Sequence, residues 1–290
     1  MKKIAIIGVG LIGASLGMAL RKNGFANAVV GYGRSSKNLE KAVQLGAIDR
    51  FEASIREACV GAEIVVVAAS LGATASILRE VGAYVADGSI ITDVGSVKGS
   101  VVADARLILG AKFDIFVPGH PIAGNEKSGA EAAIPDLFKN HKVILTPTPD
   151  TRIEAVNQIE KLWTELGSEV LKMTVESHDR ALAMTSHLPH LLAYNVMDTL
   201  LRQDDSRSLL EFSAGGFRDF TRIASSNPEL WADILLMNKD NIVKFCDEFK
   251  SGLNSLMLAL EATDRELIIE TFSDAKKARD SQLIVDKKRQ

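Results

Sequence analysis

An apolar start followed by regularly spaced glycines is the feature that most constrains the fold of this chain. The opening segment "KIAIIGVGLIGASLGMAL" carries Gly8, Gly10 and Gly13. Between a strand and a helix, this spacing permits a tight turn, the approach of a pyrophosphate to the backbone, and close helix–strand packing. The phosphates then face the helix N-terminus at Gly10, Leu11 and Ile12. The alternative is a fortuitous glycine turn, but the pattern and its position predict a dinucleotide-binding βαβ unit.

Short β-branched runs alternate with amphipathic stretches through the first part of the chain. The runs cover residues 3–8, 28–32, 63–69, 89–94, 113–119 and 142–147, and the amphipathic stretches include 37–45, 73–86 and 97–109. Unalternated Val/Ile strands separated by helices are typical of a parallel sheet that is covered on both faces. This part, residues 1–172, is therefore predicted to be an α/β domain with a Rossmann-type, doubly wound parallel sheet.

The pattern changes in the second part of the chain. Residues 176–285 contain long helical patterns and no comparable β-branched run. Apolar residues recur every three or four positions, which predicts an all-α domain over residues 173–290. This helical segment carries more apolar surface than so few helices can bury by themselves. We therefore expect a homodimer to bury the remaining apolar surface.

Composition and charge exclude several classes of function. The 290 residues are 47 % hydrophobic and 24 % charged, with a formal net charge of −3. This balance does not favour a nucleic-acid partner, and no run approaches the ~20 apolar residues of a membrane span. Cys59 and Cys246 lie far apart without metal-ligand spacing, which indicates two reduced thiols in a cytoplasmic protein. His187 and His190 could form half a metal site, but no cysteine or acidic cluster completes it, so no metal is expected.

The segment "VVGYGRSSKN" departs from the usual cofactor pattern. An acidic residue about twenty positions after the glycine turn normally binds the ribose 2′-hydroxyl, but Gly33 occupies that position. A glycine does not repel a 2′-phosphate, and Arg34, Ser35 and Ser36 offer donors to one. The segment therefore favours NADP over NAD. In the alternative, Arg34 is a solvated loop cation and the ribose is held by backbone and serines.

Two further segments place polar side chains at predicted strand ends. "TDVGSVKGS" brings Ser96 there, and "FVPGHPIAGNEKSG" brings His120 and Glu126. Ligands of a doubly wound sheet gather at the carboxyl ends of its strands. A neutral imidazole in that place can accept a hydroxyl proton while hydride leaves the same carbon. These residues predict a dehydrogenase active site.

Five segments together carry a family resemblance. "GVGLIGASL", "TDVGSVK", "GHPIAGNEKSG", "SHLPH" and "GGFRDFTRIASSNPELW" occur in this order between residue 4 and about residue 235. In combination the chain resembles the prephenate/arogenate (cyclohexadienyl) dehydrogenases of tyrosine biosynthesis. The resemblance implies a Rossmann domain followed by a helical dimerisation domain. It also implies oxidative decarboxylation of prephenate, arogenate or both, with hydride transfer to a nicotinamide cofactor, giving 4-hydroxyphenylpyruvate, tyrosine or both.

The resemblance also implies roles for single residues. His120 corresponds to the catalytic histidine and Ser96 to a serine that contacts the same substrate hydroxyl beside the nicotinamide. His190 and Arg222 correspond to residues that hold the substrate's side chain and carboxylates, and Arg218 is expected to bind the substrate beside Arg222. Trp231 corresponds to an aromatic residue that lines the pocket, and Glu126 to a loop acid that can pair with an active-site arginine. Arg218 precedes Arg222 by four positions, so both cations are expected on one helical face.

Other interpretations remain open at the level of sequence. A β-hydroxyacid dehydrogenase shares this layout, but it would use a lysine where "SHLPHLLAYN" offers histidines. A nicotinamide-binding regulatory module would bind cofactor without turnover. His178 and Asp179 could be a pair at a helix N-terminus, and Arg218 and Arg222 could be surface cations paired with Asp219. The residues do not distinguish prephenate from arogenate.

Overall fold

The structure is a computed structural model that describes residues 2–124 and 127–289, with side-chain surroundings through residue 281. The chain divides into two compact units, residues 1–241 and 242–290. The first unit contains both sheets and the helices α1 to α11, and the second contains most of α12 and all of α13.

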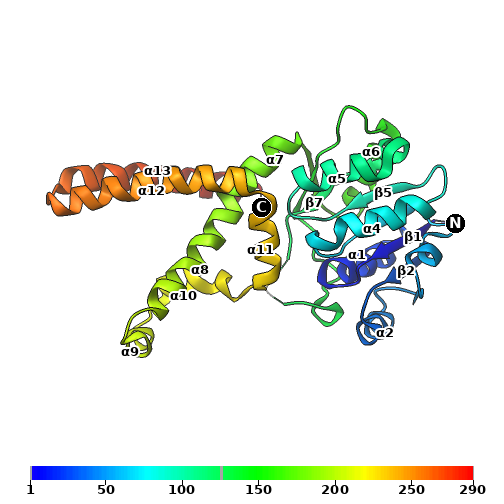
Figure 1. The fold of residues 1–290 in the computed structure, drawn as a ribbon, viewed down its shortest axis with the longest axis horizontal. Coiled ribbons are helices and arrows are strands. Elements are labelled where there is room, and N and C mark those ends of the chain that lie inside the picture. The colour runs from blue at the N-terminus through cyan, green and yellow to red at the C-terminus, as the bar shows by residue number, and fades with distance from the viewer. Residues whose placement is uncertain (1, 125–126, 290) are drawn as a thin grey trace. The chain divides into compact units, whose positions relative to one another are not determined.

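A six-stranded parallel sheet forms the core of the first unit, in the order β3-β2-β1-β4-β5-β6. The strands are β1 (Lys3–Ile7), β2 (Ala28–Tyr32), β3 (Arg50–Phe51), β4 (Ile64–Val67), β5 (Ile90–Asp93) and β6 (Phe116–Val117). The helices of this region are α1 (Leu11–Lys22), α2 (Ser36–Gln44), α3 (Ile55–Cys59), α4 (Leu71–Tyr84) and α5 (Gly99–Leu109) (Figure 1). This order is that of a dinucleotide-binding Rossmann sheet, which confirms the predicted fold class.

The central strand β1 explains why the sequence reads as an unalternated apolar run. Ile4 and Ile6 belong to one buried cluster, and Ala5 and Ile7 belong to the other. Successive side chains of a strand point to opposite faces, so both faces of this sheet lie inside the core. A polar residue on either face of β1 would be buried.

A second, smaller sheet differs from the expected arrangement. It contains β7 (Gly119–Pro121), β8 (Lys142–Leu145) and β9 (Glu169–Lys172), with β7 antiparallel to β8 and β8 parallel to β9. The predicted single strand over 113–119 is wrong in detail, because η1 (Gly110–Ile115) precedes a short β6 and Pro118 separates β6 from β7. Proline has no N–H for a ladder, so the chain leaves one sheet there and enters the other. His120 therefore lies within a strand of the second sheet.

Helices follow β9, and α6 (Ile153–Glu165) precedes it. In the first unit they are α7 (Val175–Leu182), the π-helical η3 (Ala183–His187), α8 (Leu188–Leu201), α9 (Ser206–Glu211), α10 (Gly215–Thr221), η4 (Arg222–Ser225) and α11 (Pro228–Met237). The second unit is built from most of α12 (Lys239–Glu261) and from α13 (Arg265–Arg289). Within the described parts of the chain, no helix is long and apolar enough to cross a membrane.

Candidate active site

The glycine turn between β1 and α1 has the geometry of a pyrophosphate cradle. Gly8 has φ +102°, and a Cβ there would lie 2.5 Å from the Ala68 carbonyl oxygen. A Cβ at Gly13 would lie 2.1 Å from the Gly8 carbonyl oxygen, whereas a Cβ at Gly10 would meet nothing within 4 Å. The protein itself thus requires glycine at two of the three positions. At Gly10 the missing side chain instead leaves room for a ligand against the backbone, so the residues present fit a bound dinucleotide.

The start of α1 supplies the donors of this cradle. Gly10 is the N-cap of α1, and no side chain caps the helix. The amides of the first turn, which begins at Leu11 and Ile12, have no partner within the helix. Free amides and the helix dipole favour an anion at this end.

The loop after β2 lies where the ribose of a dinucleotide binds in this fold. Gly33 follows directly after β2, and a Cβ there would make only ordinary contact, 3.5 Å from the Leu39 side chain. Arg34, Ser35 and Ser36 are exposed. The Ser35 hydroxyl accepts a hydrogen bond from the Asn38 amide at 3.3 Å and so caps α2. Arg34, Ser35 and Ser36 were predicted to contact a phosphate, and one of them, Ser35, is already engaged as the N-cap of α2.

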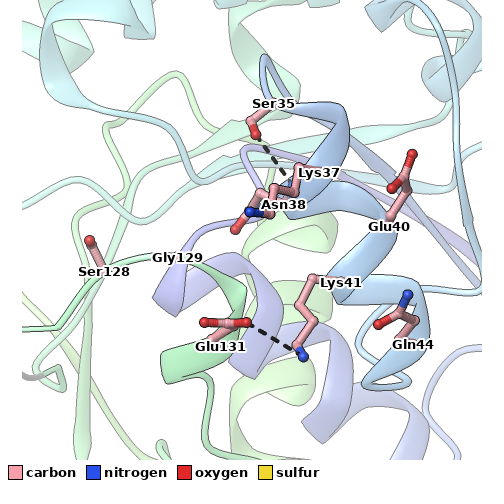
Figure 2. A pocket seen from close by; sticks show the side chains of 9 residues that line it. All are labelled: Ser35, Lys37, Asn38, Glu40, Lys41, Gln44, Ser128, Gly129 and Glu131. Carbon is pink, nitrogen blue, oxygen red and sulfur yellow. Dashed lines mark hydrogen bonds and ion pairs between the residues drawn. The ribbon is translucent and has the colours of Figure 1, made fainter.

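A hollow of about 500 Å³ lies beside this loop, between α2 and residues 128–131. Figure 2 shows Ser35, Lys37 and Lys41 on the α2 side and Glu131 opposite, where an ion pair joins Lys41 to Glu131 at 3.4 Å. Arg34 is not among the lining residues. Both signs of charge are present, so the hollow is not a simple anion site.

His120 belongs to a buried chain of hydrogen bonds. Its Nδ1 lies 2.9 Å from Nε2 of His178, and Nδ1 of His178 lies 2.7 Å from the Asp179 carboxylate. The carboxylate also accepts from the backbone amides of Lys98 and Gly99, at 2.9 and 2.7 Å. The His178 side chain is fully buried, and His120 is only 9 % exposed. Asp179 thus fixes two elements at once, the start of α5 and the histidine pair.

The hydrogen bonds from Asp179 through His178 to His120 indicate which nitrogen of His120 carries the proton. Burial alone would raise the pKa of Asp179, but the hydrogen bonds from His178 and from the Lys98 and Gly99 amides lower it. An ionised carboxylate only accepts, so the neutral form of His178 donates through Nδ1 and accepts through Nε2. His120 then donates through Nδ1, which leaves its Nε2 unprotonated. Burial, reinforced by the neighbouring His178, holds the pKa of His120 well below its usual range. In this arrangement His120 is a neutral imidazole whose Nε2 carries a free lone pair.

A buried ion pair supports the strand that carries His120. Lys98 Nζ donates to the Asp93 carboxylate and, at 2.7 Å, to the Gly119 carbonyl oxygen. Asp93 accepts in turn from the amides of Gly119 at 3.2 Å and Gly95 at 2.8 Å. Both side chains of the pair are at most 1 % exposed. Removing one partner of such a pair leaves an uncompensated buried charge, which typically costs about 3–5 kcal/mol.

Ser96 is held by the same framework. It is half-buried in the loop between β5 and α5. Gly95 on one side of it bonds Asp93, and Lys98 two residues later bonds both Asp93 and Asp179. The loop of Ser96 and the strand of His120 are therefore fixed on a common carboxylate, as the prediction that both contribute to one site requires.

A second cluster of rings joins the first through Asn238. The Asn238 side-chain amide donates to the Asp179 carbonyl oxygen at 2.8 Å and lies 3.1 Å from Nδ1 of His187. The His187 ring meets the Trp231 ring edge-on. The His190 ring stacks on the Trp231 ring, with centroids 3.5 Å apart and an interplanar angle of 18°. A continuous set of contacts thus runs from His120 to His190 and Trp231.

The histidines of this cluster are also neutral. Burial lowers the pKa of His187 to about 4 and lowers the pKa of His190. His190 Nδ1 donates to the Ser186 carbonyl oxygen at 2.9 Å. His187 ends the π-helical turn η3, and such insertions are frequent at functional sites. Within the described residues, no group of three or more His, Cys, Asp or Glu side chains could hold a metal ion.

Arg218 and Arg222 are exposed, unlike the buried histidines. Arg218 is exposed and donates to the Ser213 carbonyl oxygen at 2.9 Å, close to the start of its own helix. α10 ends at Thr221, so exposed Arg222 opens the 3₁₀ turn η4 and the two do not belong to one regular α-helix. The hydrogen bonds that connect His120 to His187 do not pass through either arginine. Glu126 lies outside the described residues.

The sequence did not reveal that His178, Asp179 and Asn238 connect the predicted site residues His120 and His190. The first two read only as a pair near a helix start, and α7 does begin just before them. A His-Asp dipeptide in the first turns of the helix that follows β9 is the signal that could have drawn attention to them. Their partner His120 is 58 residues away, and no local pattern reports such a contact.

Fold and site together define a class: a Rossmann dehydrogenase with a buried histidine pair next to its parallel sheet, followed by a helical region. Comparison with known proteins makes the assignment specific. Residues 16–172 match the family model "Prephenate dehydrogenase, nucleotide-binding domain", and residues 174–274 match "Prephenate dehydrogenase, dimerization domain". The chain belongs to the prephenate dehydrogenase family, as the five motifs predicted.

Individual relatives agree with this assignment. Cyclohexadienyl dehydrogenase of Zymomonas mobilis is 35 % identical over 280 residues, covering 96 % of this chain and 95 % of that protein. The crystal structure of prephenate dehydrogenase from A. aeolicus in complex with hydroxyphenyl propionate and NAD+ has a TM-score of 0.91 and 36 % identity, covering 97 % and 98 % of the two chains. Synechocystis arogenate dehydrogenase has a TM-score of 0.82 and 26 % identity, covering 97 % and 99 %.

Proposed function

We propose that this chain oxidises and decarboxylates prephenate, arogenate or both, in tyrosine biosynthesis. The observation that carries the proposal is the chain His120–His178–Asp179, which leaves Nε2 of His120 unprotonated. That nitrogen accepts the proton of the ring hydroxyl. The nicotinamide, when bound, accepts the hydride from the same ring carbon.

The remaining bonds follow from the substrate. Loss of hydride and proton turns the ring C–OH into C=O, and the C–C bond to the ring carboxylate then breaks with release of carbon dioxide. Its electron pair completes the aromatic ring, and the resulting phenolate recovers a proton from His120. Aromatisation makes the step effectively irreversible. The protein therefore has to position the hydroxyl and hold one proton, which the Asp179 carboxylate stabilises through His178.

We assign the other predicted residues by their places. Ser96 contacts the reacting hydroxyl, from a loop fixed on Asp93. His190, stacked on Trp231, together with Arg218 and Arg222 receives the substrate side chain and its carboxylates, because a guanidinium matches a carboxylate in shape and charge. Glu126 stays a proposed pocket residue on the ground of the family motif alone.

The choice between substrates and cofactors is decided by one experiment. Rates are measured with prephenate or arogenate against NAD or NADP, following the absorbance of the reduced cofactor, with 3-hydroxyisobutyrate as a third substrate. We expect turnover with at least one cyclohexadienyl compound and none with the hydroxyacid. Cofactor binding without any turnover would indicate a regulatory module instead.

We propose NADP as the preferred cofactor, because Gly33 directly follows β2 and places no carboxylate beside the ribose. The variant Gly33→Asp tests this choice. A Cβ at position 33 makes only ordinary contact with Leu39, so a side chain can begin there without a clash. We expect the NADP/NAD ratio of kcat/KM to fall by about tenfold or more, because the new carboxylate repels the 2′-phosphate of NADP and accepts a hydrogen bond from the ribose 2′-hydroxyl of NAD. An unchanged ratio would mean that this loop does not select the cofactor.

We further propose that the chain functions as a homodimer in the cytoplasm. The helices of the second unit expose large apolar side chains, among them Phe249, Leu253, Met257, Leu260, Leu267 and Phe272. Side chains of this kind on one unit are typical of a surface that a partner covers. Both cysteines are free, as expected in a reducing compartment. Light scattering on the eluting protein should give twice the mass of one chain, and Leu253→Glu combined with Met257→Glu should lower it.

A further inference from the structure

Asn38, on the first turns of α2, joins three segments that are far apart in the sequence. Its side-chain amide donates to the Val9 carbonyl oxygen at 2.7 Å, and its side-chain oxygen accepts from the Ala130 amide at 2.9 Å. Its own backbone amide donates to Ser35 in the loop after β2. Figure 2 shows Asn38 between Ser35 and the segment of Gly129. Both polar atoms of this side chain are therefore used in long-range contacts.

The Val9 carbonyl has a special place in the chain. Val9 lies between Gly8 and Gly10, at the centre of the turn that faces the pyrophosphate. In a planar trans peptide the C=O and the following N–H point in opposite directions. A bond that fixes the Val9 carbonyl toward α2 therefore also fixes the Gly10 N–H away from α2. Gly10 caps α1 without a side chain, so the direction of this peptide sets the donors of the cradle.

The Ala130 contact connects the same residue to the segment that follows the strand of His120. Ala130 is fully buried. This segment has a second attachment, because Ser15 on α1 accepts from the Ile134 amide at 2.9 Å. The Ser15 side chain thus bonds this segment from α1, whereas the Asn38 side chain bonds both the segment and the glycine turn.

We infer that Asn38 is a positioning residue for the dinucleotide: it orients the Val9–Gly10 peptide and thereby sets the affinity for the pyrophosphate, which NADP and NAD share. The inference rests on the proposed cofactor binding and adds a residue to it. It predicts an effect on cofactor affinity that is independent of the 2′-phosphate. Gly33 and Asn38 then have separate tasks, one in choosing the cofactor and the other in binding either.

The test uses Asn38→Ala and Asn38→Asp, with Ser15→Ala as the matched control. Dissociation constants of NADP and NAD are measured directly by titration calorimetry, and kcat and KM are measured with the active substrate. For Asn38→Ala we expect both dissociation constants to rise by a similar factor, roughly tenfold for the loss of two hydrogen bonds. We expect kcat at saturating cofactor to change by less than about threefold. The ratio of the NADP and NAD dissociation constants should be the same in this variant as in the wild type.

Asn38→Asp separates the two side-chain contacts. Aspartate can still accept from the Ala130 amide, but it places a carboxylate oxygen against the Val9 carbonyl. We expect cofactor affinity to fall at least as far as in Asn38→Ala. Wild-type affinity in Asn38→Asp, or an equal loss in Ser15→Ala, would overturn the inference, since the segment of Ala130 would then be the cause. Wild-type protein that binds cofactor but oxidises neither cyclohexadienyl compound would refute the proposed function and leave the affinity comparison intact.

Discussion

The strand of His120 and the turn of Arg222 hold their side chains in different ways. His120 is buried, and every link behind it, through His178 to Asp179, is a short hydrogen bond between buried groups. Arg222 is exposed at the start of a 3₁₀ turn, and Arg218 is exposed on the helix before it. Groups that take part in bond making gain from a fixed geometry, because reorganisation during the reaction then costs little. Groups that only bind a charged substrate can remain on the surface.

The comparison predicts that substitutions near His120 lower kcat and that substitutions near Arg222 raise KM. The largest effect is expected for His120→Asn, which keeps the size of the side chain and removes the base. We expect kcat to fall by ~10²–10⁴-fold with a small change in substrate KM. The control is His141→Asn, an exposed histidine bonded to the Lys139 carbonyl, which should retain full activity. An unaffected kcat in His120→Asn would remove the proposed base.

Asp179→Asn should have the next largest effect. An amide in place of the carboxylate brings an N–H₂ group against donors, because Asp179 accepts from His178 and from two backbone amides. His178 then has no ionic acceptor, and the tautomer that leaves Nε2 of His120 free is no longer favoured. We expect kcat to fall by roughly 10²-fold, or about 3 kcal/mol of transition-state stabilisation.

A purely structural role for Asp179 predicts a different result. The buried donor left without a partner would then cost about 1–3 kcal/mol of stability, with kcat per folded molecule unchanged. Thermal unfolding and active-site titration of the same preparation separate the two. Loss of kcat in fully folded, fully titrated protein supports a role of Asp179 in the chemical step through His178.

Arg222→Ala tests the exposed side of the comparison. A charge-assisted hydrogen bond contributes about 1.5–3 kcal/mol, so the KM of the substrate should rise by roughly 10- to 100-fold. We expect kcat to change little, since Arg222 does not belong to the hydrogen-bond chain of His120. Arg207→Ala, at an exposed arginine of α9, is the matched control for loss of a surface cation. A drop in kcat at unchanged KM would place Arg222 in the chemical step.

The fold was predictable where information is local, and the site was predictable only in part. The glycine spacing and the buried Val/Ile runs each lie within about ten residues, and they correctly indicated the parallel sheet. The second sheet depends on pairing between β7, β8 and β9, which no local period encodes. His120 could be identified because a motif contains it. His178 meets His120 over a separation of 58 residues, and the contacts of Asn38 span 29 and 92 residues.

The smallest expected effect is on the pH dependence of the free energy of unfolding. Burial lowers the pKa of His187, so its protonation at acid pH should destabilise the fold, whereas an exposed group would have no such effect. His187 has a pKa of about 4 in the folded protein and about 6.5 when unfolded. The unfolded chain therefore binds the proton first as the pH falls, so stability is lost between pH 6.5 and 4 and is unaffected above 6.5. From pH 7 to 5.5 the loss should be about 1 kcal/mol.

His187→Gln removes this titration while its amide oxygen can still accept from Asn238. Denaturant unfolding at the two pH values should therefore show a smaller acid-induced loss for this variant than for the wild type. His120 and His190 also have lowered pKa values because they are buried, and their contribution remains in both proteins, so only the difference between the two belongs to His187. Equal losses in variant and wild type would mean that His187 is protonated as easily in the fold as in solution. The rings around Asn238 would then be accessible to water. The difference in burial between the histidines and the two arginines would then hold for His120 but not for His187.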